Sequence, residues 1–232
     1  MKIVVNHLTR MRPGYICVAG IDTSTREHVR PVLRAAQLRR DLVVRHGGPF
    51  DIGSVVYIGD AQCIGRPPEV EDHVFDPERA AQAYVMNPDP FWNLLRRLAH
   101  KKLTAIFGDD LTPRASGCTV DVGKGRASLG CLLPAAPPTI YIDGYNKVRI
   151  AVTDGASTVD LSVTDLRLFE DDQKTPRAKL AAKINQRIRD GVRVIASVGL
   201  ARAWQKPGDT EARHWLQVNN IHLEDDPVWR LG

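Results

Sequence analysis

Residues 139–169, TIYIDGYNKVRIAVTDGASTVDLSVTDLRLF, decide the fold expected for the C-terminal half of this chain. Within this stretch, KVRIAVT (147–153) and TVDLSVT (158–164) alternate apolar and polar residues, which is typical of antiparallel strands with one buried face. TIYID (139–143) and LRLF (166–169) have the composition of two further short strands, and GYN and DGAS supply the turns. The stretch therefore predicts a meander of three or four strands.

A helix and two more strands follow this meander. TPRAKLAAKINQRIRDG (175–191) predicts a helix that Thr175 caps, that has Pro176 at its first position and that Gly191 ends. RVIASVGLARAW (193–204) and HWLQVNNIHLE (214–224) then read as strands. A helix after the third strand and two strands after the helix are the order of a small, partly open β-barrel of the OB type.

The N-terminal half shows the same composition with a weaker pattern. YICVAGID (15–22) and HVRPV (28–32) predict a hairpin, and SVVYIGDAQCI (54–64) predicts a strand. Helix start signals at Asp76–Pro77 and Asp89–Pro90 predict helices over 77–85 and 90–102.

The two halves meet at the Gly- and Pro-rich residues 108–138. We therefore expect a mainly β protein with some helix (α+β), made of two small OB-like barrels joined by helices and this Gly/Pro-rich segment. The expected domains are residues 1–125, a first barrel with a helical insertion, and residues 126–232, a second barrel.

Composition narrows the class of protein. Apolar residues make up 43% and charged residues 25% of the 232 residues, which is typical of a globular chain. No apolar run approaches the roughly 20 residues that span a bilayer, and the N-terminus lacks the pattern of a signal peptide. We expect a cytoplasmic protein with no membrane partner. Its four cysteines, which lack metal-ligand spacing, are expected to be buried thiols.

Motifs of catalysis are absent from the sequence. It has no GxxxxGK[ST] loop, no GxGxxG after a strand, no HExxH and no GxSxG, so we expect no catalytic residues, no cofactor and no metal. One loop, PPEVEDHV (67–74), groups Glu71, Asp72 and His73, which could bind a divalent metal. A metal-dependent nuclease or nucleotide-processing enzyme is therefore one alternative; the other interpretation is an acidic loop that forms salt bridges with nearby arginines.

The net charge of +5, carried mostly by arginine, suits a polyanionic partner. The last third of the chain collects side chains that suit phosphates, base stacking and base edges. With Arg30 of the first hairpin, the candidate nucleic-acid-binding residues are Arg30, Arg202, Trp204, Lys206, Arg213, His214, Trp215, Gln217 and Asn219. Alternation places Trp215, Gln217 and Asn219 on one face of the last strand and Asn220 with the apolar set, where it is structural.

Three segments together resemble a prokaryotic family of dual OB-fold domain proteins: ICVAGIDTSTREHVRPV (16–32), PPEVEDHVFDP (67–77) and SVGLARAW with RHWLQVNNIHLEDDPVW (197–204, 213–229). The matching positions are Cys17, Gly20, Asp22, Arg30, Pro31, Pro67, Pro68, Glu71, Asp72, Gly199, Leu200, Arg202, His214, Trp215, Leu216, Gln217, Val218 and Asn219. The resemblance implies two barrels and nucleic-acid recognition, in a DNA-processing or anti-phage defence setting.

The expected function is non-enzymatic binding of DNA or RNA, single-stranded or structured. The partner is nucleic acid, and a partner enzyme of the same system is an additional expectation. A protein-docking adaptor of a defence or repair complex is the remaining alternative.

Overall fold

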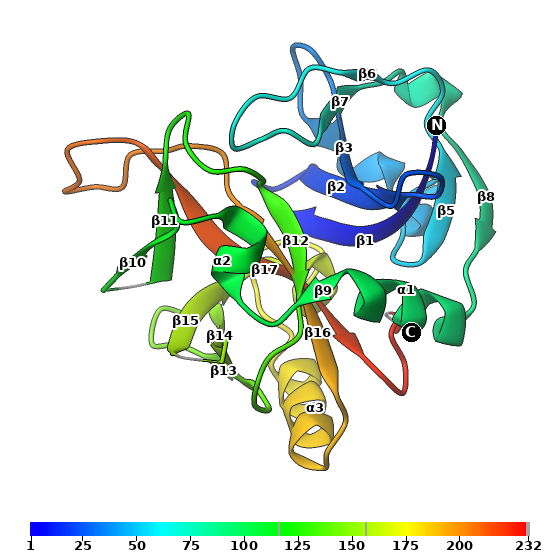
Figure 1. Cartoon of the computed structure of the whole chain (residues 1–232). Coiled ribbons are helices and arrows are strands. Elements are labelled where there is room, and N and C mark those ends of the chain that lie inside the picture. The colour runs from blue at the N-terminus through cyan, green and yellow to red at the C-terminus, as the bar shows by residue number, and fades with distance from the viewer. Residues whose placement is uncertain (116, 156, 231–232) are drawn as a thin grey trace.

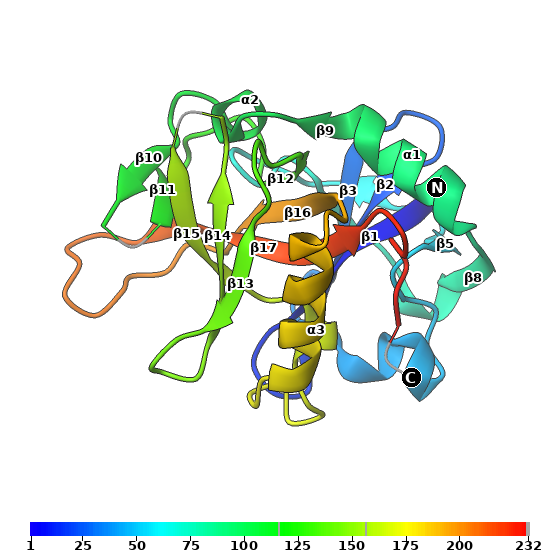
Figure 2. The ribbon, with the colours of Figure 1, turned by 90° about the horizontal axis from the view of Figure 1, so that it is seen from below.

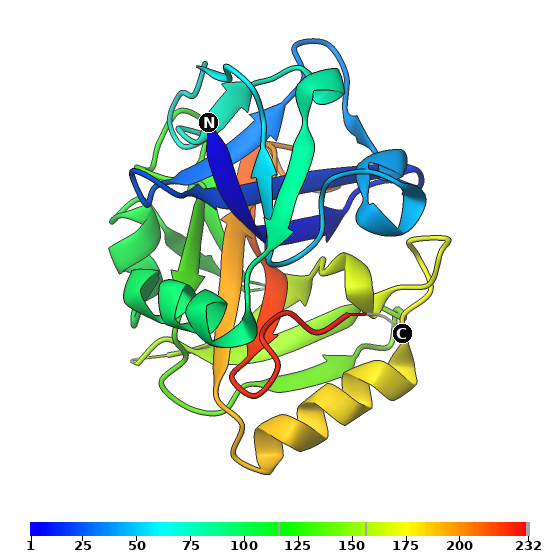
Figure 3. The ribbon, with the colours of Figure 1, turned by 90° about the vertical axis from the view of Figure 1, so that its right-hand side faces the viewer.

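The computed structural model describes residues 1–115, 117–155 and 157–230, and its strands form two sheets (Figure 1). The first sheet comprises β1–β8 and the second comprises β9–β17. Figure 3 shows the two sheets stacked, with the N-terminal strands above and helix α3 (Ala178–Arg189) on the outer side of the second sheet. The expected fold class, mainly β with two OB-like units, is confirmed.

Eight strands form the first sheet: β1 (Lys2–Arg10), β2 (Tyr15–Asp22), β3 (His28–Val32), β4 (Leu38–Arg39), β5 (Ser54–Tyr57), β6 (Gln62–Cys63), β7 (Asp72–Val74) and β8 (Ala81–Val85). β1 pairs with β2, β2 with β3, and β3 runs parallel to β7. β6 pairs with β7, whereas β5, just before β6 in sequence, pairs with β1. Together β5 and β6 act as one bent strand that closes a ring of five, as in an OB barrel.

Nine strands form the second sheet: β9 (Ala99–His100), β10 (Thr112–Arg114), β11 (Gly117–Asp121), β12 (Leu129–Leu132), β13 (Thr139–Ile142), β14 (Val148–Thr153), β15 (Thr158–Val163), β16 (Val194–Leu200) and β17 (Arg213–Leu223). The order β13-β14-β15-β17-β16-β12 contains a parallel pair, β15 with β17. Because β12 and β13 are successive in the chain, they act as one split strand and close a second ring of five strands.

Helix α3 lies between the third and fourth strands of the second ring, as the sequence predicts, and packs against β13 (Figure 2). Its buried residues Ala181, Ile184 and Ile188 recur at helical spacing. Gly191, with a φ of 98°, follows its C-terminus. The expected cap is wrong: the Thr175 hydroxyl donates to Asp172, and the helix starts after Arg177 without a side-chain cap. The corresponding place in the first ring holds β4 and two 3₁₀ turns, Arg40–Leu42 and Val44–His46.

Helix α1 (Pro88–Leu98) confirms the start of the helix predicted over 90–102, but the helix ends at Leu98, because Ala99–His100 form β9 and pair with β12. A short helix, α2 (Leu103–Phe107), follows. The helix predicted over 77–85 is wrong. Asp76 caps only a 3₁₀ turn, Pro77–Arg79, and the chain then extends as β8 along the edge of β5. Backbone pairing with β5 therefore overrides local helix propensity. LRLF is likewise a 3₁₀ turn, Leu166–Leu168, and not a strand.

The two barrels share a wall made by β1 and β17. Residues 3–9 of β1 are all buried, because one face of the strand looks into its own barrel and the other meets the second barrel. The side chain of Asn220 accepts a hydrogen bond from the amide of Leu8 (2.6 Å) and donates to its carbonyl (3.2 Å). Asn220 thus completes the backbone pairing of β1 across the interface, which confirms its structural role.

Apolar packing also crosses the interface. Cys131, Leu166 and Ile195 of the second half belong to the apolar core of the first barrel. The expected domain boundary at 125/126 remains a prediction. β9, β10 and β11 lie before it in the sequence and pair within the second sheet. All four cysteines are free. Cys118 and Cys131 are buried, and Cys17 is half-buried. Cys63 is exposed, contrary to the expectation of a buried thiol, because β6 lies at the end of its sheet.

Candidate nucleic-acid interface

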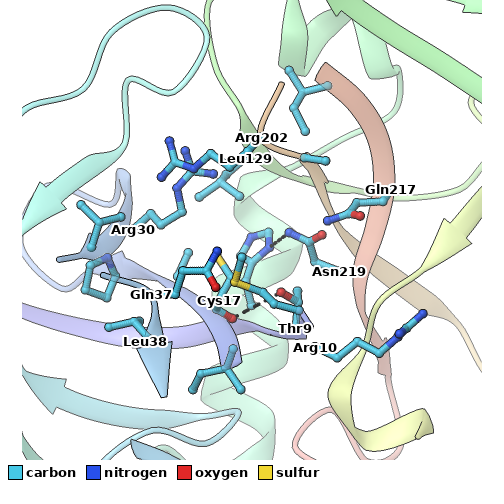
Figure 4. A pocket seen from close by; sticks show the side chains of 18 of the residues that line it. Thr9, Arg10, Cys17, Arg30, Gln37, Leu38, Leu129, Arg202, Gln217 and Asn219 are labelled. Atoms are coloured by element: carbon cyan, nitrogen blue, oxygen red, sulfur yellow. Dashed lines mark hydrogen bonds between the residues drawn. The ribbon is translucent and has the colours of Figure 1, made fainter. Parts of the chain in front are cut away.

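A pocket of about 910 Å³ lies between the two barrels, and we call it the inter-barrel pocket. One wall comes from β1, β2, β3 and the residues that follow β1 and β3; the other comes from β16, β17 and the connector after β16 (Figure 4). Its lining residues are His7, Thr9, Arg10, Met11, Arg12, Ile16, Cys17, Ala19, Arg30, Pro31, Val32, Leu33, Ala36, Gln37, Leu38, Leu129, Leu200, Ala201, Arg202, Trp204, Gln217 and Asn219. Four of these residues are arginines and none is acidic.

The position of the pocket follows from the fold. In OB barrels, the face of the second and third strands, with the loops after the first and fourth strands, binds oligonucleotides. In the first barrel this face is β2 and β3, and the loop after β1 contributes Met11 and Arg12. The second barrel covers this face and converts it into a two-walled pocket.

Arg30, Asp72 and Arg202 form a charge network at one side of the pocket. The parallel register of β3 and β7 places Arg30 beside Asp72, and Arg30 Nε lies 2.5 Å from Asp72 Oδ1. Arg202, just after β16, places Nη1 2.7 Å from Asp72 Oδ2 and 2.9 Å from Glu69 Oε1. Burial opposes the charge of Arg202, but Asp72 and Glu69 outweigh it, so the pKa of Arg202 lies above its usual value. The network joins the three sequence segments that carry the family resemblance.

His7 of β1 and Asn219 of β17 form a polar pair at the shared wall. The Asn219 amide nitrogen donates to His7 Nδ1 at 3.0 Å, so the proton of the neutral imidazole lies on Nε2. Burial, with the nearby His28, His222 and Arg30, holds the pKa of His7 well below its usual value. Gly199 makes room for the pair, because a Cβ there would lie 2.4 Å from the Asn219 amide nitrogen.

Arg10 and Arg12 lie at the end of β1 and just after it. The Arg10 guanidinium stacks on Phe169 and donates to the Gln173 carbonyl, and Arg12 stacks on Tyr15 and donates to Gln37. Neither arginine has an ion-pair partner among the residues that the structure describes. Burial lowers the pKa of Arg10, and the negative charge of Asp172 partly offsets this effect, so Arg10 already has a carboxylate in its neighbourhood.

The polar atoms that lack a hydrogen-bond partner concentrate at this pocket. Across the described parts of the chain, seven buried side-chain nitrogen or oxygen atoms make no hydrogen bond. Four of them are His7 Nε2, Arg10 Nε, Arg30 Nη2 and Asn219 Oδ1, and all four belong to residues that line the inter-barrel pocket. Since native proteins satisfy most buried polar groups, such a concentration points to a ligand site.

Eight of the nine residues predicted from the sequence divide between two places. Arg30, Arg202, Trp204, Gln217 and Asn219 line the inter-barrel pocket. Lys206, Arg213 and Trp215 line a smaller hollow of about 260 Å³ with Arg114, Ala115 and Asp209, which we call the Trp215 hollow. Their role in binding nucleic acid remains a prediction.

His214, the ninth residue, is buried. Its Nδ1 donates to the Ala201 carbonyl at 2.9 Å and lies 3.8 Å from Glu69 Oε1. His214 therefore supports the connector that carries Arg202 and does not line either hollow.

The side chains of Glu71, Asp72 and His73, which suggested a metal-dependent nuclease, bind other groups of the protein. Glu71 Oε1 accepts from the amides of Ser128 and Leu129, and Oε2 accepts from the Ser128 hydroxyl. Asp72 binds the two arginines, and His73 Nδ1 bonds to the Glu71 carbonyl. No group of three or more His, Cys, Asp or Glu side chains in the described ranges is placed to hold a metal ion.

His7, Thr9 and Gln37 line the pocket but were not predicted from the sequence. A signal for His7 is present: Asn6 and His7 interrupt the otherwise apolar run IVVNHL of the first strand. A polar pair inside a fully buried strand indicates a hydrogen-bonded wall or a site.

Comparison with known proteins gives one match. The family model of the dual OB-containing domain matches residues 1–221. No curated protein and no solved structure shows significant similarity to the chain. None of the helices within residues 1–115, 117–155 and 157–230 is long and apolar enough to cross a membrane.

Proposed function

We propose, from the premise that this chain belongs to the dual OB-containing domain family, that it binds single-stranded DNA or RNA at the inter-barrel pocket without catalysing a reaction on it. A dual OB domain is a fold suited to nucleic acids or oligonucleotides. The observation that carries the proposal is the lining of the pocket, which has four arginines and no acidic residue and covers the oligonucleotide-binding face of the first barrel; three of the arginines come from the first barrel and Arg202 comes from the second.

Electrostatics support a phosphate-bearing ligand. Among the described residues Arg12 contacts only Gln37 and the Tyr15 ring, and Arg10 lies in the field of Asp172 without a direct ion pair, so a phosphate would not have to displace a bonded carboxylate at either arginine. Arg30 is held rigidly by Asp72, with Nη2 still unbonded, and Arg202 is half exposed at the mouth. Planar guanidinium groups with free N–H groups suit bidentate phosphate contacts.

Stacking supports a single strand over a duplex. Trp204 lines the pocket, and its side chain is 47% exposed. A base stacked on an aromatic ring contributes about 1–3 kcal/mol, and only unpaired bases can splay onto such a ring.

The setting that we propose, a prokaryotic DNA-processing or anti-phage defence system in the cytoplasm, is supported only by the family resemblance. A partner enzyme of the same system belongs to that proposal. Neither is needed for the binding that the pocket supports.

The test is fluorescence anisotropy with labelled single-stranded DNA and RNA at low and moderate salt. Arg202→Ala should weaken binding about tenfold, which is the value of one lost charge-assisted contact. Arg189→Ala on α3, at the far side of the second barrel in Figure 3, removes the same charge and should leave affinity unchanged. Absence of binding to every strand tested would refute the proposal.

A further inference from the structure

A second hollow lies between helix α1 and the turn that joins β2 to β3, and we call it the α1 groove (Figure 2). Its volume is about 470 Å³. Besides Asn93, its lining consists of four apolar side chains, from α1 and from the residue after β8, and of two arginines, one on the turn and one on α1: Met86, Pro90, Leu94, Leu98, Arg26 and Arg97. None of the lining residues is acidic or aromatic.

The two arginines of the α1 groove are not compensated by the protein. Within the described parts of the chain, Arg26 and Arg97 form no ion pair and no side-chain hydrogen bond. Both are exposed, and Lys101 and Lys102, exposed just beyond α1, carry charge of the same sign. A surface with one sign of charge favours a partner of the opposite sign and rejects partners of its own sign.

The backbone of Arg26 is held in a conformation that does not suit arginine. Its φ is 67°, in the left-handed region that glycine and asparagine adopt at lower cost. Asp22 builds the turn: its Oδ1 accepts from the amides of Ser24 (2.7 Å) and Thr25 (3.0 Å), and its carbonyl accepts from the amide of Arg26 (3.0 Å). The turn therefore uses the backbone of Arg26 but no atom of its side chain.

Two other residues with positive φ show what is unusual about Arg26. Asn146 belongs to a type that tolerates this conformation, and Gln173 has a packing reason for it. The Gln173 side chain is buried, accepts from the amide of Gly14 and donates to the carbonyl of Tyr15. Among the described residues with positive φ other than glycine, Arg26 alone lacks such a reason. Backbone strain that the fold does not need indicates a functional side chain.

The chemistry of the α1 groove suits a peptide better than a nucleic acid. With no aromatic ring in its lining, it offers a base nothing to stack on. Its apolar floor fits an apolar side chain, as in other peptide-binding grooves. Guanidinium groups on either side of such a floor suit carboxylates, which they bind bidentately.

The α1 groove is also separate from the inter-barrel pocket. The pocket takes Thr9 and Arg10 from the C-terminal end of β1, where they pair with the first residues of β2. Arg26 follows the last residues of β2, at the opposite end of this pair of strands. The two sites share no lining residue, so each can be occupied without the other.

We propose that the α1 groove docks an acidic segment of a partner protein, with an apolar side chain on its floor and carboxylates on Arg26 and Arg97. The inference goes beyond the proposed function, because it concerns a different ligand at a different place. The protein thereby holds a partner while the inter-barrel pocket remains open to a single strand.

The experiment uses a panel of fluorescein-labelled ten-residue peptides in which pairs of aspartates flank a leucine or a phenylalanine. Anisotropy measures their binding to the full chain at low salt. One control set replaces the apolar residue by serine, and a second replaces the aspartates by asparagines. We expect members of the panel to bind, and each control peptide to bind about tenfold more weakly or not at all.

Arg26→Asn is the decisive variant. It removes the charge at a backbone position that asparagine adopts more readily, so peptide binding should weaken about tenfold while the Tm stays unchanged or rises. Arg97→Ala should weaken peptide binding similarly. Arg189→Ala removes a charge of α3, outside the groove, and should change nothing. A lower Tm in Arg26→Asn would assign Arg26 a structural role and overturn the inference.

The remaining outcomes separate peptide docking from its rivals and from the proposed function. Failure of the whole panel to bind, or equal binding of the serine controls, would overturn it. Weaker single-strand binding by Arg26→Asn would assign the groove to nucleic acid. A dimer in analytical ultracentrifugation that Arg97→Glu dissociates would make a second copy the occupant. Either result would overturn partner docking, whereas single-strand binding by the wild-type protein tests the proposed function alone.

Discussion

The inter-barrel pocket and the Trp215 hollow are both lined in part by the connector between β16 and β17, and both contain arginine and tryptophan. Each place contains paired and unpaired arginines: Asp72 and Glu69 pair with Arg30 and Arg202 of the pocket, and Arg114 of the hollow forms no ion pair among the described residues. The comparison is therefore between Arg213 of the hollow and Arg10 and Arg12 of the pocket.

In the Trp215 hollow, Arg213 faces Asp121, Asp209 and Glu211. In the pocket, Arg10 and Arg12 have no ion-pair partner in the described parts of the chain. The pocket lining also holds four of the seven buried side-chain atoms that make no hydrogen bond in the described parts of the chain, against one, Trp215 Nε1, in the hollow. The amount of unused hydrogen-bonding capacity, and not residue type, separates the two places.

The aromatic residues of the two hollows differ in the same way. Lys206 lies over the ring of Trp215, 5.1 Å from its centroid, and the ring is half-buried. Trp204 is 47% exposed at the mouth of the pocket. We accordingly expect the two hollows to respond differently to matched substitutions.

The largest difference is expected in stability. Asp72→Asn leaves the buried Arg30 without its carboxylate, and breaking a buried ion pair costs about 3–5 kcal/mol. Asp121→Asn breaks the pair with Arg213 at the Trp215 hollow, where Asp121 is 61% exposed and the cost is about 0–1 kcal/mol. Urea unfolding of both variants measures the difference; equal losses would contradict it.

Acid should destabilise the wall beneath the pocket. Burial, followed by the charge of Arg167, lowers the pKa of His222 from 6.5 to about 4. Between pH 6.5 and 4 the unfolded chain binds more protons at His222 than the folded protein does. The free energy of unfolding therefore has its highest value above pH 6.5 and falls as the pH drops towards 4. The loss from His222 alone is about 3 kcal/mol, and His28, whose pKa burial also lowers to about 4, adds to it.

Denaturation across this pH range, with His222→Gln beside wild type, tests the assignment. The variant should show a flatter pH profile. A wild-type profile in His222→Gln would show that another group is responsible.

Affinity should depend on one tryptophan and not the other. Trp204→Ala removes the exposed ring of the pocket and should weaken single-strand binding by about 1–3 kcal/mol. Trp215→Ala should leave affinity unchanged, since Lys206 covers that ring. Anisotropy titrations measure both, and the opposite result would move the site to the Trp215 hollow.

The smallest effect is expected at single arginines. Arg12→Ala should weaken binding about fivefold and reduce the slope of log affinity against log salt by about 0.7, the value for one phosphate of a single strand. Arg213→Ala should change neither, because three carboxylates already surround Arg213. Titrations at several salt concentrations give both slopes, and identical slopes for the two variants would contradict the comparison.

The second barrel could be predicted from sequence to a large extent. Alternation in 147–153 and 158–164 and the helix signals of 175–191 are local properties, and β14, β15 and α3 follow them. Residues 77–85 could not be predicted in this way, because their extended form depends on pairing with β5, a contact between segments distant in sequence.

The site was predictable only in part, for the same reason. Arg30, Asp72 and Arg202 are far apart in the chain and meet only when β3, β7 and the end of β16 are assembled. Alternation along β17 correctly placed Gln217 and Asn219 together on one side, but it could not show that Trp215 lies in a separate hollow. Nor could it pair Asn219 with His7 of the other barrel.

Photocrosslinking tests the central claim most directly. A single-stranded oligonucleotide that carries iodouracil is crosslinked to the wild-type protein, and the modified peptides are mapped by mass spectrometry. The account predicts crosslinks at the inter-barrel pocket, at Trp204 and in the segment of Met11 and Arg12. Crosslinks confined to Trp215 and its neighbours in the Trp215 hollow would contradict it.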